Sequence, residues 1–334
     1  TLQVSSYRLP FRRPFVTAHG HLSFREGWLA RVHSAEGIIG IGEAAPLAAF
    51  TPETHAQAGA ALRAAAAQLA GRRLELGTPG PDADPFAWVG LGDWAREAAR
   101  HSPTARHALE CALLDLLAQA ADKRLAAWLM PAASKSLPDR VAVNATLGDA
   151  TVEETVAQAQ AAIEAGFGTL KLKVGRDGDH DGARLHALRK VLGPAPRLRI
   201  DANGAWDLAT ATRLLNDWAE LGLEYVEQPL PAADLKGMAT LARRSPVPLA
   251  VDEALLHEAD AQRVLDAGAA QVWVVKPMAL GGPLPALRVA RLAAASGLQT
   301  VVTTLLEGVY GRTAALHCAA ACHALPGTIQ PPLA

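Results

Sequence analysis

Five charged residues recur at a nearly constant interval in the second half of the chain. Each follows a short apolar run, as in LRIDANGAW around residue 201, and the five are Lys173, Asp201, Glu227, Asp252 and Lys276. Successive members are 24 to 28 residues apart, close to the ~30 residues of one strand-and-helix unit. A single acid at a strand end is typical of a turn. Here five charged residues occupy equivalent positions, in the order lysine, three acids, lysine. This pattern indicates that their side chains converge on one site.

The three acids predict a metal site. Carboxylates that point at one spot repel one another unless a cation lies between them. Carboxylate oxygens suit Mg²⁺, so we expect Asp201, Glu227 and Asp252 to bind this ion, with Mn²⁺ as a substitute. Asn203 lies two residues after Asp201, on the same side if the strand continues, where it would support the ligands or the substrate.

The lysines predict proton transfer beside that metal. Lys171 and Lys173 share one face of a strand because side chains alternate with period two. A neighbouring cation lowers the pKa of a lysine, so we expect Lys173 to act as a general base, and Lys276 lies on the facing strand. Such a site suits removal of a proton next to a carboxylate. The alternative is a metal-binding barrel without catalysis, in which Lys173 is dispensable.

The elements that position these residues are short strands alternating with helices. Seven apolar runs are separated by amphipathic helical stretches, which predicts parallel strands with helical crossovers. The runs cover residues 141–147, 169–174, 198–203, 224–230, 249–255, 272–277 and 300–305. A TIM-type (β/α) barrel fits better than a doubly wound sheet, because no dinucleotide-binding glycine loop follows the first strand. The G-x-G in GIIGIGEA leads into APL and not into a helix.

The first third of the chain predicts a separate α+β module. Strand-like runs occupy residues 1–45, helices are expected over 53–73 and 104–130, and a loop over 76–85. We place the domain boundary between residues 103 and 104, which gives a module of residues 1–103 and a barrel of residues 104–334.

Composition excludes several classes of partner. The 32 lysines and arginines nearly balance the 33 acids, so we expect no nucleic-acid or membrane partner. The first residues lack the order of a signal peptide. Three cysteines are expected to be buried thiols in a cytoplasmic protein, Cys111, Cys318 and Cys322. The sequence leaves open whether the chain is a monomer or a homo-oligomer.

The segments KLKVG, DANGAW, VEQPL, VDEAL and VVKP, in this order and spacing, resemble the enolase superfamily, in its muconate-lactonizing-enzyme-like branch. The resemblance covers nearly the whole chain. It implies a modified (β/α)₇β barrel under an N-terminal α+β capping domain, with a C-terminal cap-packing segment that is short or missing here. It also implies that Asp201, Glu227 and Asp252 bind Mg²⁺ and that Lys173 and Lys276, assisted by Lys171, are catalytic.

Reactions in this branch include o-succinylbenzoate synthesis, N-succinylamino-acid racemization and dipeptide epimerization. GIGEAAPLAAFTPET and TVVTTLLEGVYGRTAAL resemble segments of the o-succinylbenzoate synthases, and the acid-free GTIQPPLA lacks the Asp-x-Asp expected of a dipeptide epimerase. We therefore expect a dehydration of a small carboxylate substrate, with a racemase or epimerase as the alternative. The residues expected to contact the substrate are Asn203, Glu253, Thr303 and Thr304, with Arg12, Arg13 and Arg25 of the cap as further carboxylate partners or as a solvated basic loop.

Overall fold

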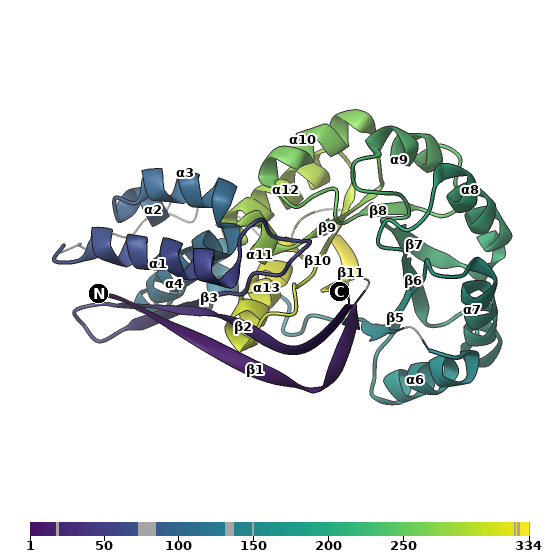
Figure 1. Cartoon of the computed structure of the whole chain (residues 1–334), viewed down its shortest axis with the longest axis horizontal. Coiled ribbons are helices and arrows are strands. Elements are labelled where there is room, and N and C mark those ends of the chain that lie inside the picture. Colours follow the sequence, from purple (N-terminus) through teal and green to yellow (C-terminus); the bar gives the residue numbers. More distant parts are fainter. Residues whose placement is uncertain are drawn as a thin grey trace.

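A computed structural model describes residues 1–17, 20–72, 85–130, 137–148, 150–323, 325 and 328–333. The chain forms an N-terminal cap beside a curved barrel sheet, with helices along the outer side of the sheet (Figure 1). None of the helices in these ranges is long and apolar enough to span a membrane.

In the described residues, the N-terminal part of the chain forms an antiparallel sheet and four helices, the last of which also packs against the barrel. Its strands are ordered β1 (Leu2–Thr17), β2 (Gly20–His33) and β3 (Ile39–Ala44). The helices are α1 (His55–Leu69), α2 (Pro85–Trp88), α3 (Gly92–His101) and α4 (Pro103–Ala120). The predicted α+β module is present, and the loop expected over 76–85 lies almost entirely outside the described residues.

The glycines of the G-x-G motif have a packing function. A Cβ atom on Gly40 would lie 2.0 Å from the Ala112 carbonyl oxygen, and one on Gly42 would lie 1.8 Å from that of Ala108. Both carbonyls belong to α4, so the glycines allow β3 to lie directly against this helix. The motif therefore serves the cap core, a role that the sequence analysis did not predict.

The barrel sheet has eight strands in chain order, and every described neighbouring pair is parallel. The strands are β4 (Ala145–Leu147), β5 (Thr169–Lys173), β6 (Arg197–Asp201), β7 (Leu223–Glu227), β8 (Leu249–Val251), β9 (Val272–Val275), β10 (Gln299–Val302) and β11 (Thr328–Leu333). The connecting helices are α6 (Val152–Glu164), α7 (Gly178–Leu192), α8 (Leu208–Asp217) with the short η1 (Ala219–Leu221), α9 (Leu235–Ala242), α10 (Glu258–Ala267), α11 (Pro277–Leu280), α12 (Pro283–Ala295) and α13 (Val309–Cys322). Seven strand-and-helix units followed by a last strand confirm the predicted (β/α)₇β architecture.

The helix predicted over 104–130 is interrupted. The chain forms α4, turns at Asp122, and continues as α5 (Leu125–Leu129). Asp122 has a φ of 50°, a left-handed conformation that aspartate tolerates better than most residues. The Lys123 N–H donates to the Ala118 carbonyl and closes the end of α4. The apolar pattern continued through this turn, which hid it from the sequence.

Alternation along the strands separates two layers of side chains. Outward residues such as Leu172, Ile200 and Val251 pack with the helices in the large barrel core. Inward residues such as Tyr225 and Val274 form a smaller cluster inside the sheet. Because the period is two, the residue two places after an inward apolar residue also faces inward. This places the polar strand ends on the inner side.

Helix α4 packs against both parts of the molecule. Its residues Ala108 and Leu109 belong to the cap core, whereas Leu114 and Ala118 belong to the barrel core. The boundary predicted between 103 and 104 assigns this helix to the barrel and stays a prediction. The three cysteines, all within the described residues, are buried and form no disulfide bond, as expected of reduced thiols.

Candidate functional site

The five recurring charged residues lie at successive strand ends. Lys173, Asp201 and Glu227 are the last residues of β5, β6 and β7, and the ladder pairs Lys173 with Asp201 and Asp201 with Glu227. Asp252 and Lys276 directly follow β8 and β9. All five therefore stand at one end of the barrel, as their interval predicted.

Lysines bridge the carboxylates. The Lys171 ammonium lies 2.6 Å from Glu227 Oε1 and 3.0 Å from Asp201 Oδ2. Lys173 donates to the same Asp201 oxygen, and Lys276 donates to Asp252 Oδ2 at 2.6 Å. Lys171 is buried, whereas the Lys173 side chain is 37% exposed. Lys173 is thus the lysine of the pair that a substrate can reach.

The charge balance is uneven across the three acids. Burial raises the pKa of Asp201, but the charges of Lys171 and Lys173 outweigh it and hold this pKa below its usual value. Burial, together with the charge of Asp201, raises the pKa of Glu227 to about 8. Burial lowers the pKa of Lys171. The charges of Asp201 and Glu227 together have the larger, opposite effect, and the pKa is well above its usual value. The positive charge of the lysines therefore stabilises the ionised form of Asp201 but is too small to do so for Glu227.

Asn203 and Glu253 lie beside the strand-end residues, and their contact with a substrate stays a prediction. Asn203 accepts a hydrogen bond from Lys173 at 2.9 Å and donates one to Glu253 Oε1 at 2.8 Å. The Asn203 backbone has a φ of 46°, a conformation that asparagine adopts more readily than most residues. Burial and the charge of Asp252 raise the pKa of Glu253 to about 7.

Gln228 is a site residue that the sequence reasoning missed. Its side-chain oxygen accepts the backbone N–H groups of Asp252 and Ala254, and its amide nitrogen donates to the Leu230 carbonyl. It is fully buried and has a φ of 37°. Gln228 thus fixes the backbone that presents Asp252. Its place directly after Glu227 in VEQPL was the available signal.

The remaining predicted substrate contacts differ in placement. Thr303 directly follows β10 and is buried, and Thr304 is half-buried beside it. Arg12 is exposed, and the side chain of Arg13 lies outside the described part of the chain. The interpretation of Arg25 as a substrate partner is wrong. Its guanidinium donates to the carbonyls of residues 45, 46, 305 and 306, so its donors already serve the backbone.

The donor set fits a hard divalent cation. Within the described ranges, no group of three or more His, Cys, Asp or Glu side chains lies close enough to hold a metal as it stands, since lysines occupy the spaces between the acids. Glu227 Oε2 and Glu253 Oε2 are nevertheless buried without a hydrogen-bond partner. Unmatched buried carboxylate oxygens call for a cation.

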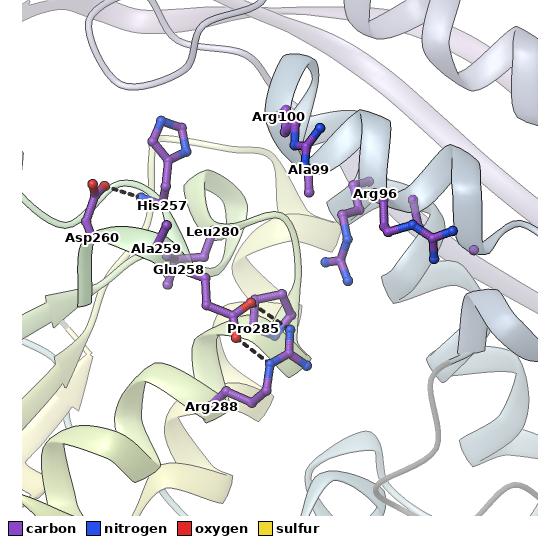
Figure 2. Close-up of a pocket in the computed structure, with 13 residues that line it drawn as sticks. Arg96, Ala99, Arg100, His257, Glu258, Ala259, Asp260, Leu280, Pro285 and Arg288 are labelled. Atoms are coloured by element: carbon purple, nitrogen blue, oxygen red, sulfur yellow. Dashed lines mark hydrogen bonds and ion pairs between the residues drawn. The ribbon is translucent and has the colours of Figure 1, made fainter. Parts of the chain in front are cut away.

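A cavity of about 530 Å³ lies elsewhere, between the cap and the outer helices of the barrel. Figure 2 shows Arg96 and Arg100 of α3 across a gap from His257, Glu258 and Arg288 of the barrel. Arg288 makes two hydrogen bonds to Glu258. None of the predicted site residues lines this cavity, so the candidate active site is the barrel end and not this groove.

Comparison with known proteins agrees with this geometry. Residues 154–328 match the family model described as Enolase C-terminal domain-like, and residues 1–82 match the MenC N-terminal domain. An L-Lys-D/L-Arg epimerase from Methylococcus capsulatus is 32% identical over 333 residues, 97% of this chain and 87% of that protein. An o-succinylbenzoate synthase from Thermobifida fusca is 42% identical over 191 residues, 56% of this chain and 58% of that protein.

Among solved structures, the dipeptide epimerase from Methylococcus capsulatus complexed with Mg and the dipeptide L-Arg-D-Lys has a TM-score of 0.83. It is 30% identical, and the match covers 98% of this chain and 88% of that one. A family model spanning over half of the chain and a relative matched along almost its whole length show the family. The chain is an enzyme of the enolase superfamily, in its muconate-lactonizing-enzyme-like branch.

Proposed function

We propose that this enzyme is an o-succinylbenzoate synthase. It would convert 2-succinyl-6-hydroxy-2,4-cyclohexadiene-1-carboxylate to o-succinylbenzoate, a step of menaquinone or phylloquinone biosynthesis. The observation that carries the proposal is the match of residues 1–82 to the MenC N-terminal domain. The cap is the part in which enzymes of this branch are expected to differ, because the proton-abstracting residues of the barrel are shared.

The reaction removes one proton and one hydroxide from the ring. Lys173, as the free amine, takes the α-hydrogen as a proton on Nζ. The electron pair of that bond forms a ring double bond while the C–O bond breaks and hydroxide leaves. Lys276 lies four strands away in the order of the sheet and would stabilise negative charge from the opposite side.

Asp201, Glu227 and Asp252 would hold Mg²⁺, with Lys171 fixing the first two. When bound, Mg²⁺ supplies positive charge for the substrate carboxylate as electron density accumulates there. The donors are oxygens of buried carboxylates, and the Methylococcus structure contains Mg. We assign Asn203, Glu253, Thr303 and Thr304 to contacts with the substrate.

The second candidate is an N-succinylamino-acid racemase or a dipeptide epimerase. The epimerase from Methylococcus capsulatus matches nearly the whole chain, whereas the synthase match covers 56% of it. In a racemase Lys276 would act as a second proton carrier. Against a dipeptide epimerase, the segment GTIQPPLA contains no acid for a substrate ammonium group.

A paired assay separates the two. With Mg²⁺ present, the cyclohexadiene substrate is followed by loss of diene absorbance, and N-succinylamino acids and dipeptides are followed by α-deuterium incorporation in D₂O. We expect rapid diene loss and slow or no exchange. Fast exchange into an N-succinylamino acid or a dipeptide without formation of the aromatic product would replace this proposal with the second candidate.

A further inference from the structure

A cap residue lies directly on Lys276. The centroid of the Phe50 ring is 4.1 Å from Lys276 Nζ, and Asp252 Oδ1 is 2.5 Å from the same nitrogen. The ammonium is therefore held between an aromatic face and a carboxylate. An ammonium at this distance is attracted by the negative face of the ring. Phe50 is more than 200 residues from Lys276 in the chain.

A tight turn presents this ring. The N–H groups of Phe50 and Thr51 both donate to the Leu47 carbonyl, and the Leu47 N–H donates to the Thr51 hydroxyl. Ala49 has a φ of 73°, which is unfavourable for a residue with a Cβ atom. Strain of this kind persists where the surrounding structure imposes it, and it commonly marks a functional segment.

The segment that leads into the turn is anchored to the barrel. Arg25 donates to cap carbonyls of residues 45 and 46 and to barrel carbonyls of residues 305 and 306. Glu43 accepts the N–H groups of Gly308 and Gly311 at the start of α13. In Figure 1 the connection from β3 to α1 reaches toward β9 and β10. These anchors fix the Phe50 turn relative to the strand ends.

We propose that Phe50 is a positioning residue that holds the Lys276 ammonium at the barrel end through its aromatic face. The inference rests on the proposed role of Lys276. The contact makes the position of the Lys276 ammonium depend on how the cap docks on the barrel. If Phe50 were only apolar filling, with Leu47, Met278 and Leu305 of the same cluster, a leucine would serve equally well.

The contact is testable without activity. Lysines labelled with ¹³C at Cε report ring currents, and Lys276→Arg identifies the signal of residue 276. We expect an upfield shift of the Lys276 Hε protons in the wild type and in Phe50→Tyr, and its loss in Phe50→Leu. Phe167→Leu makes the same chemical change before β5, at the opposite barrel end, and should leave the signal in place. An unshifted Lys276 signal in the folded wild type would overturn the proposal.

The kinetic consequence is tested on the substrate that the wild type turns over. Phe50→Leu should lower kcat about tenfold with KM changed less than about threefold, and Phe50→Tyr should restore most of kcat. If Phe50→Leu does not fold, Phe50→Met provides bulk without a ring. Wild-type kcat in a ringless variant would overturn the proposal. A wild type that turns over none of the assayed substrates contradicts the proposed function instead, and the NMR shift alone then decides the contact.

Discussion

Two buried carboxylates in this molecule have opposite surroundings. Glu43, at the seam between cap and barrel, accepts hydrogen bonds from the Tyr7 hydroxyl and from the N–H groups of Gly308 and Gly311. Glu227, at the barrel end, has one oxygen bound by Lys171 and the other without a partner. Both are at most 1% exposed.

The difference is the one expected between a structural carboxylate and the metal ligand that we propose for Glu227. A buried acid with donors on both oxygens stabilises the fold, because each hydrogen bond replaces one lost from water. A buried acid with an unmatched oxygen costs stability until a cation or substrate arrives. Glu43 therefore joins two parts of the fold, whereas Glu227 keeps a free oxygen at the position where we propose that it binds Mg²⁺.

The largest expected effect is on function at the barrel end. Lys173→Ala should lower turnover by about 10³-fold or more, because it removes the proposed base. Its unfolding temperature should stay near that of the wild type, since the side chain is 37% exposed. Turnover is measured with and without Mg²⁺, and Lys190→Ala, an exposed lysine of α7, is the matched control. Retained turnover would show that Lys173 is not the base, whereas a wild type that binds Mg²⁺ without turning over any substrate would favour the metal-binding barrel without catalysis.

The next effect concerns stability at the seam. Glu43→Gln replaces the charged carboxylate by a neutral amide. The new NH₂ group then faces a hydrogen-bond donor, either the Tyr7 hydroxyl and the Gly308 N–H or the Gly311 N–H. We expect a loss of about 3 kcal/mol in the free energy of unfolding, measured by urea denaturation. Glu227→Gln at pH 6 should cost far less, because that carboxyl is already largely protonated there when the metal is absent. Equal losses for the two variants would refute the comparison.

The pH dependence of stability should reveal the unmatched acid. The pKa of Glu227 is raised in the fold from 4.5 to about 8, so the folded state holds a proton that the unfolded state releases. The resulting stability is present below pH 4.5 and is lost as pH rises toward 8. Glu253, with its pKa raised to about 7, adds to this trend.

In EDTA, each of these two acids should therefore lower the free energy of unfolding by up to about 1.4 kcal/mol per pH unit as pH rises from about 5 towards its folded pKa. Glu227→Gln should remove the part of this slope that Glu227 contributes, and Glu220→Gln, an exposed acid, should not change it. Denaturation curves across the pH range measure the effect. If the slope is the same in the wild type and in Glu227→Gln, a group other than Glu227 binds the proton that the folded state retains.

The smallest effect should come from Tyr7→Phe. The Tyr7 hydroxyl donates to Glu43 Oε1, which still has the Gly308 N–H as a second donor. We expect a loss of about 1 kcal/mol in the free energy of unfolding, with little change in turnover. A loss as large as that of Glu43→Gln would show that the hydroxyl, and not the backbone, satisfies the carboxylate.

Much of the barrel could be predicted because its signals are local. Each strand is a short apolar run with an adjacent helix, and the repeat of these units gave both the seven runs and the strand ends at Lys173, Asp201 and Glu227. The helix break at Asp122 was missed because a single left-handed residue leaves the apolar pattern intact. Gln228 was missed because its place directly after Glu227, the one available signal, is equally typical of a turn residue.

The sequence by itself determined which side chains meet at the barrel end, because consecutive parallel strands present their last residues at the same edge. Only the tertiary structure decided how they are paired: Lys171 with Glu227, Lys276 between Asp252 and Phe50, and Arg25 with backbone carbonyls. The first of these pairs depends on how the barrel strands curve toward one another, and the contacts of Phe50 and Arg25 depend on the docking of the cap on the barrel. No local pattern encodes that docking, since it depends on how two separately built surfaces fit.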